Sequence, residues 1–141
     1  RADVYFVLVN TPLLPGTEDL PNVIYLKAFM DDMRRAAFIR TCDAMLHGRR
    51  TGETFGLAIA EFSVCNRPVI TSHLYTERNT ARFHLDTLGE RGIYYHDCSS
   101  LVRILQTFDR ADAQRHDWNA YRQFEPARVM QTFKRIFLSD V

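Results

Sequence analysis

Short apolar runs alternate with segments of helical periodicity along the chain. Continuous apolar runs at Val4–Val9 and Val23–Leu26 predict strands, and the first is typical of a strand buried on both faces. Apolar positions at helical spacing predict helices at Asp31–Cys42 and Pro126–Phe137. Because such strands and helices alternate, the sequence predicts a Rossmann-like, doubly wound α/β fold. We expect a five-stranded, mainly parallel sheet flanked by helices.

The remaining predicted elements are shorter. They comprise strands at 44–46, 69–71 and 93–95, and helices at 55–65, 76–88 and 99–108. We expect the charged segment 110–114 to be a connector. In a parallel sheet of this kind, ligands bind at the carboxyl ends of the strands. The segment 47–53 lies at that edge and is therefore the first place to look for a site.

The segment from Cys42 to Ser72 is a strand–helix–strand unit whose helix is apolar on nearly every side. Such a helix is typically buried between layers. Glu61 is the only charged residue between Glu53 and Arg67. A buried carboxylate needs water, a donor or a ligand, because its desolvation otherwise costs several kcal/mol, roughly.

The start of this helix suits an anion. Its first N–H groups lack intrahelical partners, and the helix dipole is positive there. Gly56 lacks a Cβ and could let a ligand approach the backbone. The alternative interpretation needs no ligand: Glu53 would be an acid at a helix N-terminus, and Glu61 would face solvent.

The motif that connects these two acids is similar to one in a known family. It runs Glu53-Thr54-Phe55-Gly56-Leu57-Ala58-Ile59-Ala60-Glu61, and Asn66-Arg67-Pro68-Val69-Ile70-Thr71 follows it. It resembles the Glu-seven-residues-Glu motif of the retaining, family-4-like glycosyltransferases, whose two-domain fold is called GT-B. Thr54 stands where glycine is commoner, and the resemblance extends more weakly over most of the chain.

The resemblance implies a domain that binds a nucleotide-diphosphate sugar and transfers the sugar with retention, without a metal or another cofactor. Glu53 would be the catalytic carboxylate that contacts the transferred sugar. Glu61 would accept hydrogen bonds from the ribose of the donor. The substrate-binding backbone that holds the sugar and the diphosphate would be that of Thr54, Phe55, Gly56 and Leu57.

The resemblance also implies that the chain is part of a longer enzyme. The family domain opens with an additional strand and helix, and an N-terminal domain binds the acceptor. We therefore expect residues 1–141 to form a single α/β donor-binding domain, a fragment that lacks these parts. The fragment alone would be inactive, and the acceptor, a glycan or a lipid-linked molecule, would bind mainly to the missing domain.

Composition excludes several classes of partner. The net charge of +1 gives no reason to expect nucleic acid or an anionic membrane. Cys42, Cys65 and Cys98 are odd in number and far apart, which favours buried thiols in a reducing compartment. Without a signal-like or membrane-spanning run, we expect a cytoplasmic protein, which could lie at the cytoplasmic face of a membrane when full-length.

Other polar residues are candidates for ligand contact at the same edge. The histidines show no metal-ligand spacing, so no metal site is predicted. His47 and His73 follow strands, and Arg49 and Arg50 lie beside the expected phosphate site. The other histidines are expected at the surface or at caps, and the aromatic residues of 118–124 as packing under the last helix.

Two other functions remain open. The first is a GT-B-like sugar-nucleotide epimerase, which shares the fold but transfers nothing to an acceptor. The second is a non-enzymatic interaction module of flavodoxin-like shape. That module would carry an acidic cluster after the first strand, and Asn10-Thr11-Pro12 does not supply one.

Overall fold

A computed structural model describes residues 3–29, 31–49, 52–73 and 81–138. The strands are β1 (Phe6–Val9), β2 (Val23–Leu26), β3 (Met45–His47), β4 (Val69–Ser72) and β5 (Gly92–Tyr95). The α-helices are α1 (Asp32–Thr41), α2 (Leu57–Val64), α3 (Phe83–Leu88), α4 (Cys98–Thr107), α5 (Arg110–Ala113) and α6 (Pro126–Phe137). Short 3₁₀ turns span Gly89–Arg91 and Arg122–Phe124.

The strands form two parallel sheets within the described residues. One contains β1 and β2, and the other has the order β3-β4-β5. This confirms the predicted α/β class with parallel strands flanked by helices. The prediction of one continuous five-stranded sheet is wrong, because no ladder joins the two groups in the part of the chain that the structure describes. An apolar pattern marks which segments are strands, but it does not specify which strands pair.

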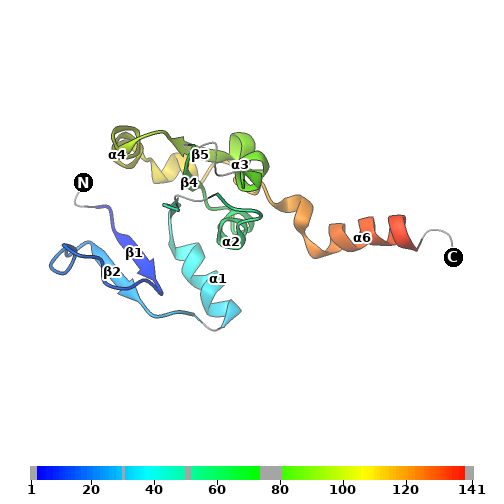
Figure 1. Cartoon of the computed structure of the whole chain (residues 1–141), viewed down its shortest axis with the longest axis horizontal. Helices are drawn as coiled ribbons and strands as arrows, with labels where there is room; N and C mark the ends of the chain where they lie inside the picture. Colours follow the sequence, from blue (N-terminus) through cyan, green and yellow to red (C-terminus); the bar gives the residue numbers. More distant parts are fainter. Residues whose placement is uncertain (1–2, 30, 50–51, 74–80, 139–141) are drawn as a thin grey trace.

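The core lies where α2 and α3 meet the three-stranded sheet. Its fully buried members are Ile59 of α2, Val69 of β4, Leu88 of α3 and Tyr121 from the segment before α6. Figure 1 shows α2 beside β4, with α1 between α2 and the β1–β2 pair. This packing fixes the start of α2 against the carboxyl edge of the sheet.

Two predictions of burial are wrong. In the predicted strand Val4–Val9, Tyr5 and Val7 are 60% and 37% exposed, because among the described residues β1 pairs only with β2 and is not covered on both faces. Helix α2 is not enclosed either. Leu57 and Val64 are 74% and 50% exposed, and only Ile59 and Ser63 of this helix are buried.

The ends of several helices differ from the prediction. The segment 110–114 contains the one-turn helix α5, which Asp109 caps. Helix α4 is capped by Asp97 in a reciprocal capping box with Ser100, rather than by the serines alone. Helix α3 begins at Phe83 within the described residues, and the first half of the predicted 76–88 helix lies outside them.

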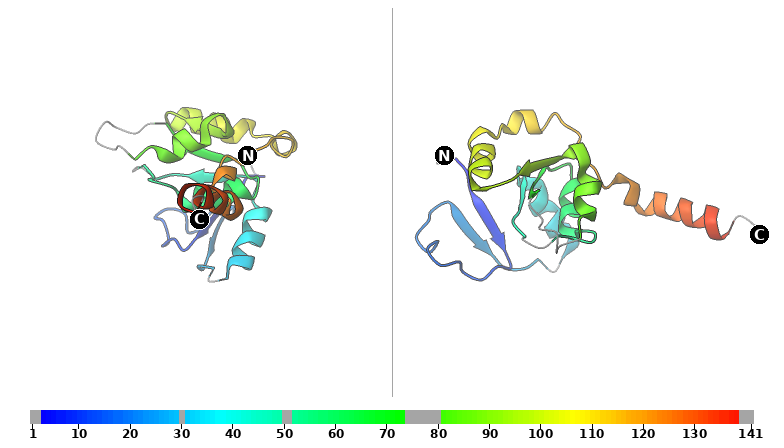
Figure 2. Two further views of the ribbon diagram at one scale, coloured as in Figure 1. Left: turned by 90° about the vertical axis from the view of Figure 1, so that its right-hand side faces the viewer. Right: turned by 45° about the horizontal axis from the view of Figure 1, so that its top comes forward.

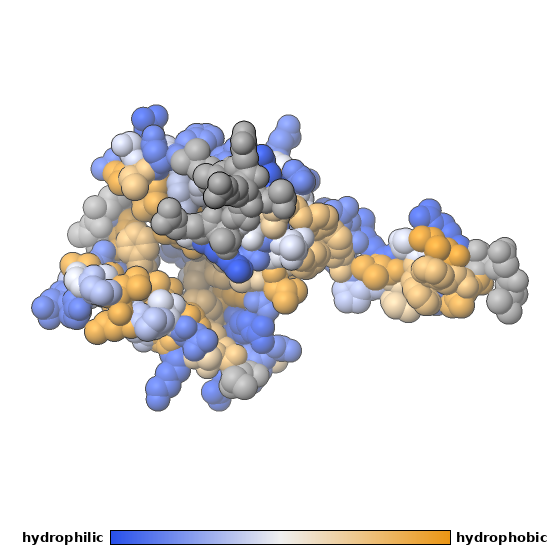
Figure 3. All heavy atoms as spheres, in the orientation of Figure 1, coloured by the Kyte–Doolittle hydropathy of each residue, from blue (hydrophilic) through white to orange (hydrophobic). Residues whose placement is uncertain are grey.

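Helix α6 projects from the body of the molecule, at the opposite end from β1 and β2 (Figures 1 and 2). It begins with Pro126 as predicted. Its apolar residues are exposed, as the space-filling view in Figure 3 shows; they are Val129, Met130, Phe133, Ile136 and Phe137. Tyr121 and Phe124 pack against Phe55. Phe124 also borders Val129 and Phe133 of α6 in a surface depression, so the predicted packing at the last helix holds in part for Phe124.

Candidate functional site

The carboxyl edge of the three-stranded sheet holds a buried polar cluster. His47 is the last residue of β3, and its ring Nδ1 lies 2.9 Å from the Thr71 hydroxyl of β4. The Tyr95 hydroxyl at the end of β5 donates to the His47 carbonyl at 3.4 Å. Because the three strands are parallel, their carboxyl ends bring these side chains to one edge.

Glu53 joins this cluster from the loop before α2. Its Oε1 accepts a 2.7 Å charged hydrogen bond from Arg49 Nη1 and lies 3.5 Å from His47 Nε2. The Glu53 side chain is 20% exposed, so the carboxylate is partly shielded while it still reaches the surface. On the backbone side, the Glu53 N–H donates a long hydrogen bond of 3.4 Å to Nδ1 of His84.

The tautomer of His47 follows from its neighbours. If Nδ1 carried the only proton, the lone pair of Nε2 would face the Glu53 carboxylate, which is repulsive. The favoured neutral form therefore accepts a hydrogen bond from the Thr71 hydroxyl at Nδ1 and directs Nε2–H toward Glu53. The side chain is only 7% exposed, and among the described residues Nε2 makes no contact closer than its 3.5 Å approach to Glu53. A buried donor thus faces the Glu53 carboxylate without forming a short hydrogen bond.

Burial and neighbouring charges shift the pKa values of the ionisable groups in this cluster. Burial lowers the pKa of His47, although Glu53 opposes the shift. Burial also lowers the pKa of His84, with help from the nearby His47. For Glu53, burial raises the pKa, but the hydrogen bonds and charges of Arg49 and His47 together outweigh it, so the pKa lies below its usual value. At neutral pH the cluster contains an ionised Glu53 between two neutral imidazoles.

The loop from Gly52 to Gly56 has a fixed backbone. A Cβ on Gly52 would lie 1.7 Å from the carbonyl oxygen of Ala81, so only glycine fits there. Gly56 has φ +78°, a left-handed conformation that glycine adopts freely. A Cβ on Gly56 would meet Ile59 at 3.1 Å, so glycine is required by the backbone, and the prediction that its bare Cα faces a ligand is not supported.

The start of α2 is open. Gly56 occupies the N-cap position and no side chain caps the helix. Thr54 and Leu57 are exposed on either side of the buried Gly56. The unpaired N–H groups of the first turn therefore remain available to an anion, next to the Glu53 carboxylate. Phe55 turns inward and packs against Tyr121 and the neighbouring rings.

Glu61 lies in a different environment, between α2 and α1. Its Oε1 accepts a 2.6 Å charged hydrogen bond from Arg35 Nη1, and both side chains are a little over one-third exposed. They line a shallow depression of about 400 Å³, together with Asp32, Ala36, Ile39, Val64 and Cys65. Glu61 is neither buried alone nor simply solvated: its partner is a cation that sequence reasoning did not identify.

The structure places the other predicted residues as follows. His73 is exposed and its ring lies near those of Tyr94 and His96. Arg50 lies outside the described residues. His84 is fully buried, contrary to the prediction of a surface or capping position. No local spacing marks His84 as a partner of Glu53, because it lies 31 positions away along the chain.

Metal clusters, membrane-spanning helices and reactive thiols were also considered as functional features of the described residues. In the described part of the chain, no group of three or more His, Cys, Asp or Glu residues could hold a metal ion. No described helix has both the length and the apolar character needed to span a bilayer. The three thiols are free, and Cys98 is exposed rather than buried as predicted, because it occupies the open first turn of α4.

The chain was compared with known families, curated proteins and solved structures. No protein family and no curated protein matches it. Two structures of HepE from Anabaena match its fold. One, solved with UDP and glucose, has a TM-score of 0.64 at 18% identity, with 96% of this chain and 40% of HepE covered. The other, solved with UDP-glucose, has a TM-score of 0.57 at 16% identity, with 99% and 50% covered.

These matches establish the fold of the chain. Because the sequence identities are below one-fifth, the likeness extends to the arrangement of elements and not to individual residues. The chain spans half or less of the length of the HepE chains that it matches. The predicted fold class is thus confirmed: the chain has a Rossmann-like α/β fold that matches part of a GT-B-type structure.

Proposed function

We propose that the chain is the donor-binding domain of a retaining glycosyltransferase of the family-4-like group. The observation that carries this proposal is the uncapped start of α2 beside the ionised, Arg49-bound Glu53, at the carboxyl edge of the sheet. An anion site and a catalytic carboxylate are thereby adjacent. The fold likeness to HepE, a protein solved with UDP-glucose, supports a nucleotide-diphosphate sugar as the ligand.

Each predicted residue has a role in the proposed site. The diphosphate lies at the start of α2, where the backbone of Thr54 to Leu57 supplies N–H groups. These groups stabilise the negative charge that grows on the diphosphate as the glycosyl bond breaks. Glu53, whose lowered pKa keeps it ionised, favours the positive charge that develops on the sugar. Glu61 accepts hydrogen bonds from the ribose hydroxyls.

The Arg35–Glu61 pair is compatible with the ribose role. A carboxylate has two oxygens and about four acceptor positions, and Arg35 occupies one oxygen at 2.6 Å. The other oxygen can accept a ribose hydroxyl in the open depression between α1 and α2. Arg35 would then hold the carboxylate in place, so that less rotational freedom is lost when the nucleotide binds.

The acceptor binds elsewhere in this proposal. We infer that the chain belongs to a longer cytoplasmic enzyme, in which a second domain faces the carboxyl edge and holds a glycan or lipid-linked acceptor. The partial coverage of HepE supports this inference, since the chain matches only 40–50% of that protein. Transfer would need neither a metal nor a cofactor, because α2 and its loop supply the stabilising charges.

The test is donor turnover by the full-length protein. UDP-glucose and other nucleotide sugars, labelled at the anomeric carbon, are incubated with acceptors, and NMR reports the anomeric configuration of the product. We expect transfer with retained configuration. An isomerised nucleotide sugar without transfer would indicate the epimerase instead. Absence of nucleotide-sugar binding in calorimetry would overturn the proposal and leave an interaction module.

A further inference from the structure

Tyr121 connects the site loop to a distant part of the chain. It is 1% exposed, and its hydroxyl donates a 2.6 Å hydrogen bond to the carbonyl of Phe55, 66 positions earlier in the chain. Burial raises the pKa of Tyr121 to about 12, and the nearby Glu53 carboxylate adds to this shift. The hydroxyl is therefore a permanent donor at neutral pH.

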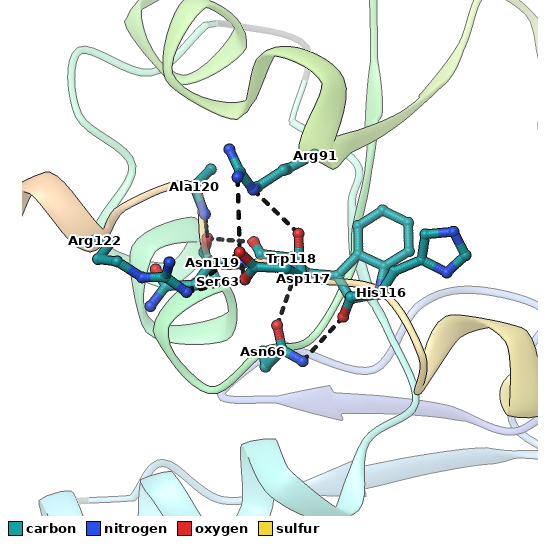
Figure 4. Close-up of polar contacts among 9 residues, drawn as sticks. All are labelled: Ser63, Asn66, Arg91, His116, Asp117, Trp118, Asn119, Ala120 and Arg122. Atoms are coloured by element: carbon teal, nitrogen blue, oxygen red, sulfur yellow. Dashed lines mark hydrogen bonds and ion pairs between the residues drawn. The ribbon is translucent and has the colours of Figure 1, made fainter.

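The backbone that precedes Tyr121 is held by side chains of α2 and of the turn that follows this helix. The Ser63 hydroxyl donates to the Trp118 carbonyl at 2.8 Å and accepts from the Ala120 N–H at 2.9 Å. The Asn66 amide bridges the segment in the same way, donating to the His116 carbonyl and accepting from the Trp118 N–H (Figure 4). Both bridges fasten the segment 116–120 to the end of α2.

Asp117 adds ion pairs on the outer side of this segment. Its carboxylate lies 3.6 Å from Arg91 and 3.1 Å from Arg122, as Figure 4 shows. All three side chains are about half exposed, so each pair contributes little by itself, on the order of 0–1 kcal/mol. Together, these contacts fix the position of the segment that carries Tyr121, and thereby the position of the Tyr121 hydroxyl relative to Phe55.

The bond to Phe55 determines the orientation of one peptide unit. In a trans peptide, the carbonyl and the following N–H point in opposite directions, and the described residues contain no cis bond. With the Phe55 carbonyl bound to Tyr121, the Gly56 N–H must point away from Tyr121. Glycine tolerates both signs of φ, so Gly56 by itself would not prevent this peptide from flipping.

The Gly56 N–H donates to no acceptor among the described residues. An N–H without an acceptor in the protein is left to bind a ligand or water. A left-handed residue followed by a helical turn directs successive N–H groups to one concavity, an arrangement that binds anions. The Gly56 N–H would thereby join those of the first turn of α2.

We propose that Tyr121 is a positioning residue for the diphosphate site. It locks the Phe55–Gly56 peptide in the orientation that adds the Gly56 N–H to the anion-binding groups of α2. This inference rests on the proposed function and extends it to a residue outside the motif. Tyr121 does not touch the substrate; it acts through the Phe55 carbonyl.

The test compares two tyrosines that make the same kind of bond. Tyr121→Phe removes the hydroxyl and keeps the ring that packs on Phe55 at 5.3 Å. Tyr94→Phe is the matched control, because the Tyr94 hydroxyl donates to the Gly89 carbonyl at 2.7 Å away from the loop. Calorimetry on the full-length protein measures affinity for UDP and for uridine, which differ only in the diphosphate.

We expect Tyr121→Phe to weaken UDP binding roughly threefold to tenfold, the effect of one lost hydrogen bond, and to leave uridine binding unchanged. Tyr94→Phe should change neither affinity. In wild-type protein labelled with ¹⁵N-glycine, UDP but not uridine should shift the Gly56 amide resonance downfield, a measurement that requires no variant to fold. An unshifted Gly56 resonance, or equal effects of Tyr121→Phe on both ligands, would overturn the role of Tyr121. Failure of the wild type to bind UDP would instead refute the proposed function.

Discussion

The two acids of the motif belong to regions with different physical character. Glu53 is 20% exposed, lies among buried imidazoles at the carboxyl edge, and is bound by Arg49. Glu61 is 38% exposed and lies between two helices, where Arg35 binds it above an open depression. Each acid has an arginine partner, but only Glu53 has a buried polar shell.

In the proposed enzyme, this difference predicts different functions for the two acids. A carboxylate in a partly shielded, preorganised cluster interacts strongly with charge that develops in a transition state, because little solvent screens it. A carboxylate in an open depression exchanges water for ligand hydroxyls at lower cost but gains less from a growing charge. In the proposed enzyme, Glu53 therefore acts mainly on turnover and Glu61 mainly on affinity.

The largest expected effect is on turnover at Glu53. Glu53→Gln keeps the shape of the side chain and removes its charge. We expect kcat of the full-length enzyme to fall by about 100-fold or more, with little change in KM, since the carboxylate acts in the transition state. Steady-state kinetics with the donor and acceptor of the enzyme measure this split.

Glu18→Gln is the matched control, because Glu18 is exposed and lies in the loop between β1 and β2. It should leave both kinetic constants unchanged. If Glu53→Gln kept the wild-type turnover, Glu53 would not be a catalytic residue. The resemblance to glycosyltransferases would then extend to the fold only. A large rise in KM at unchanged kcat would instead make Glu53 a binding residue and remove the contrast with Glu61.

The second effect is on affinity at Glu61. Glu61→Gln should weaken nucleotide binding by roughly 1–3 kcal/mol, the contribution of a charged hydrogen-bond partner. Thermal stability should change by less than about 1 kcal/mol, because the Arg35–Glu61 pair is solvent-screened. Calorimetry and thermal unfolding on the same sample separate these quantities. Unchanged nucleotide affinity would return Glu61 to the role of a partner for Arg35.

Local pattern predicted the elements of this fold well, because each strand or helix is specified by consecutive residues. The strand predicted at 44–46 is observed at Met45–His47, and α6 starts at Pro126 as predicted; they follow from the apolar pattern and from proline geometry. Which strands pair with one another is harder to predict from the sequence. The separation of β1 and β2 from the other sheet depends on which faces meet, and the apolar run at Val4–Val9 is the same whether or not a layer covers it.

The candidate site likewise divides into a part that could be predicted and a part that could not. The Glu53 loop and the start of α2 could be predicted, because the motif, the glycine and the helix start lie within nine residues of sequence. The residues that support this loop could not be predicted. His84 and Tyr121 contact this loop from 31 and 66 positions away, and neither belongs to a recognisable motif. Only the folded chain brings their donors and acceptors to the loop.

The smallest expected effect is the pH dependence of stability, which is specific to the Glu53 region. Burial holds the pKa of His47 and His84 below the ordinary 6.5. Below pH 6.5 the unfolded chain therefore binds protons that the folded chain does not, and acidification favours unfolding. Stability should be full above pH 6.5 and should decrease toward the folded-state pKa values, by at most about 1.4 kcal/mol per pH unit for each histidine. The lowered pKa of Glu53 adds a further loss only below its ordinary 4.5.

Denaturant unfolding between pH 7.5 and 5.5 measures this decrease. His47→Gln removes one of the two buried imidazoles, so its stability should depend less steeply on pH over this range. His96→Gln, at an exposed histidine, is the control and should retain the wild-type slope. A slope in His47→Gln equal to that of the wild type would mean that His47 does not carry the dependence. The contrast between a buried, electrostatically tuned Glu53 region and an open Glu61 region would then rest on geometry alone.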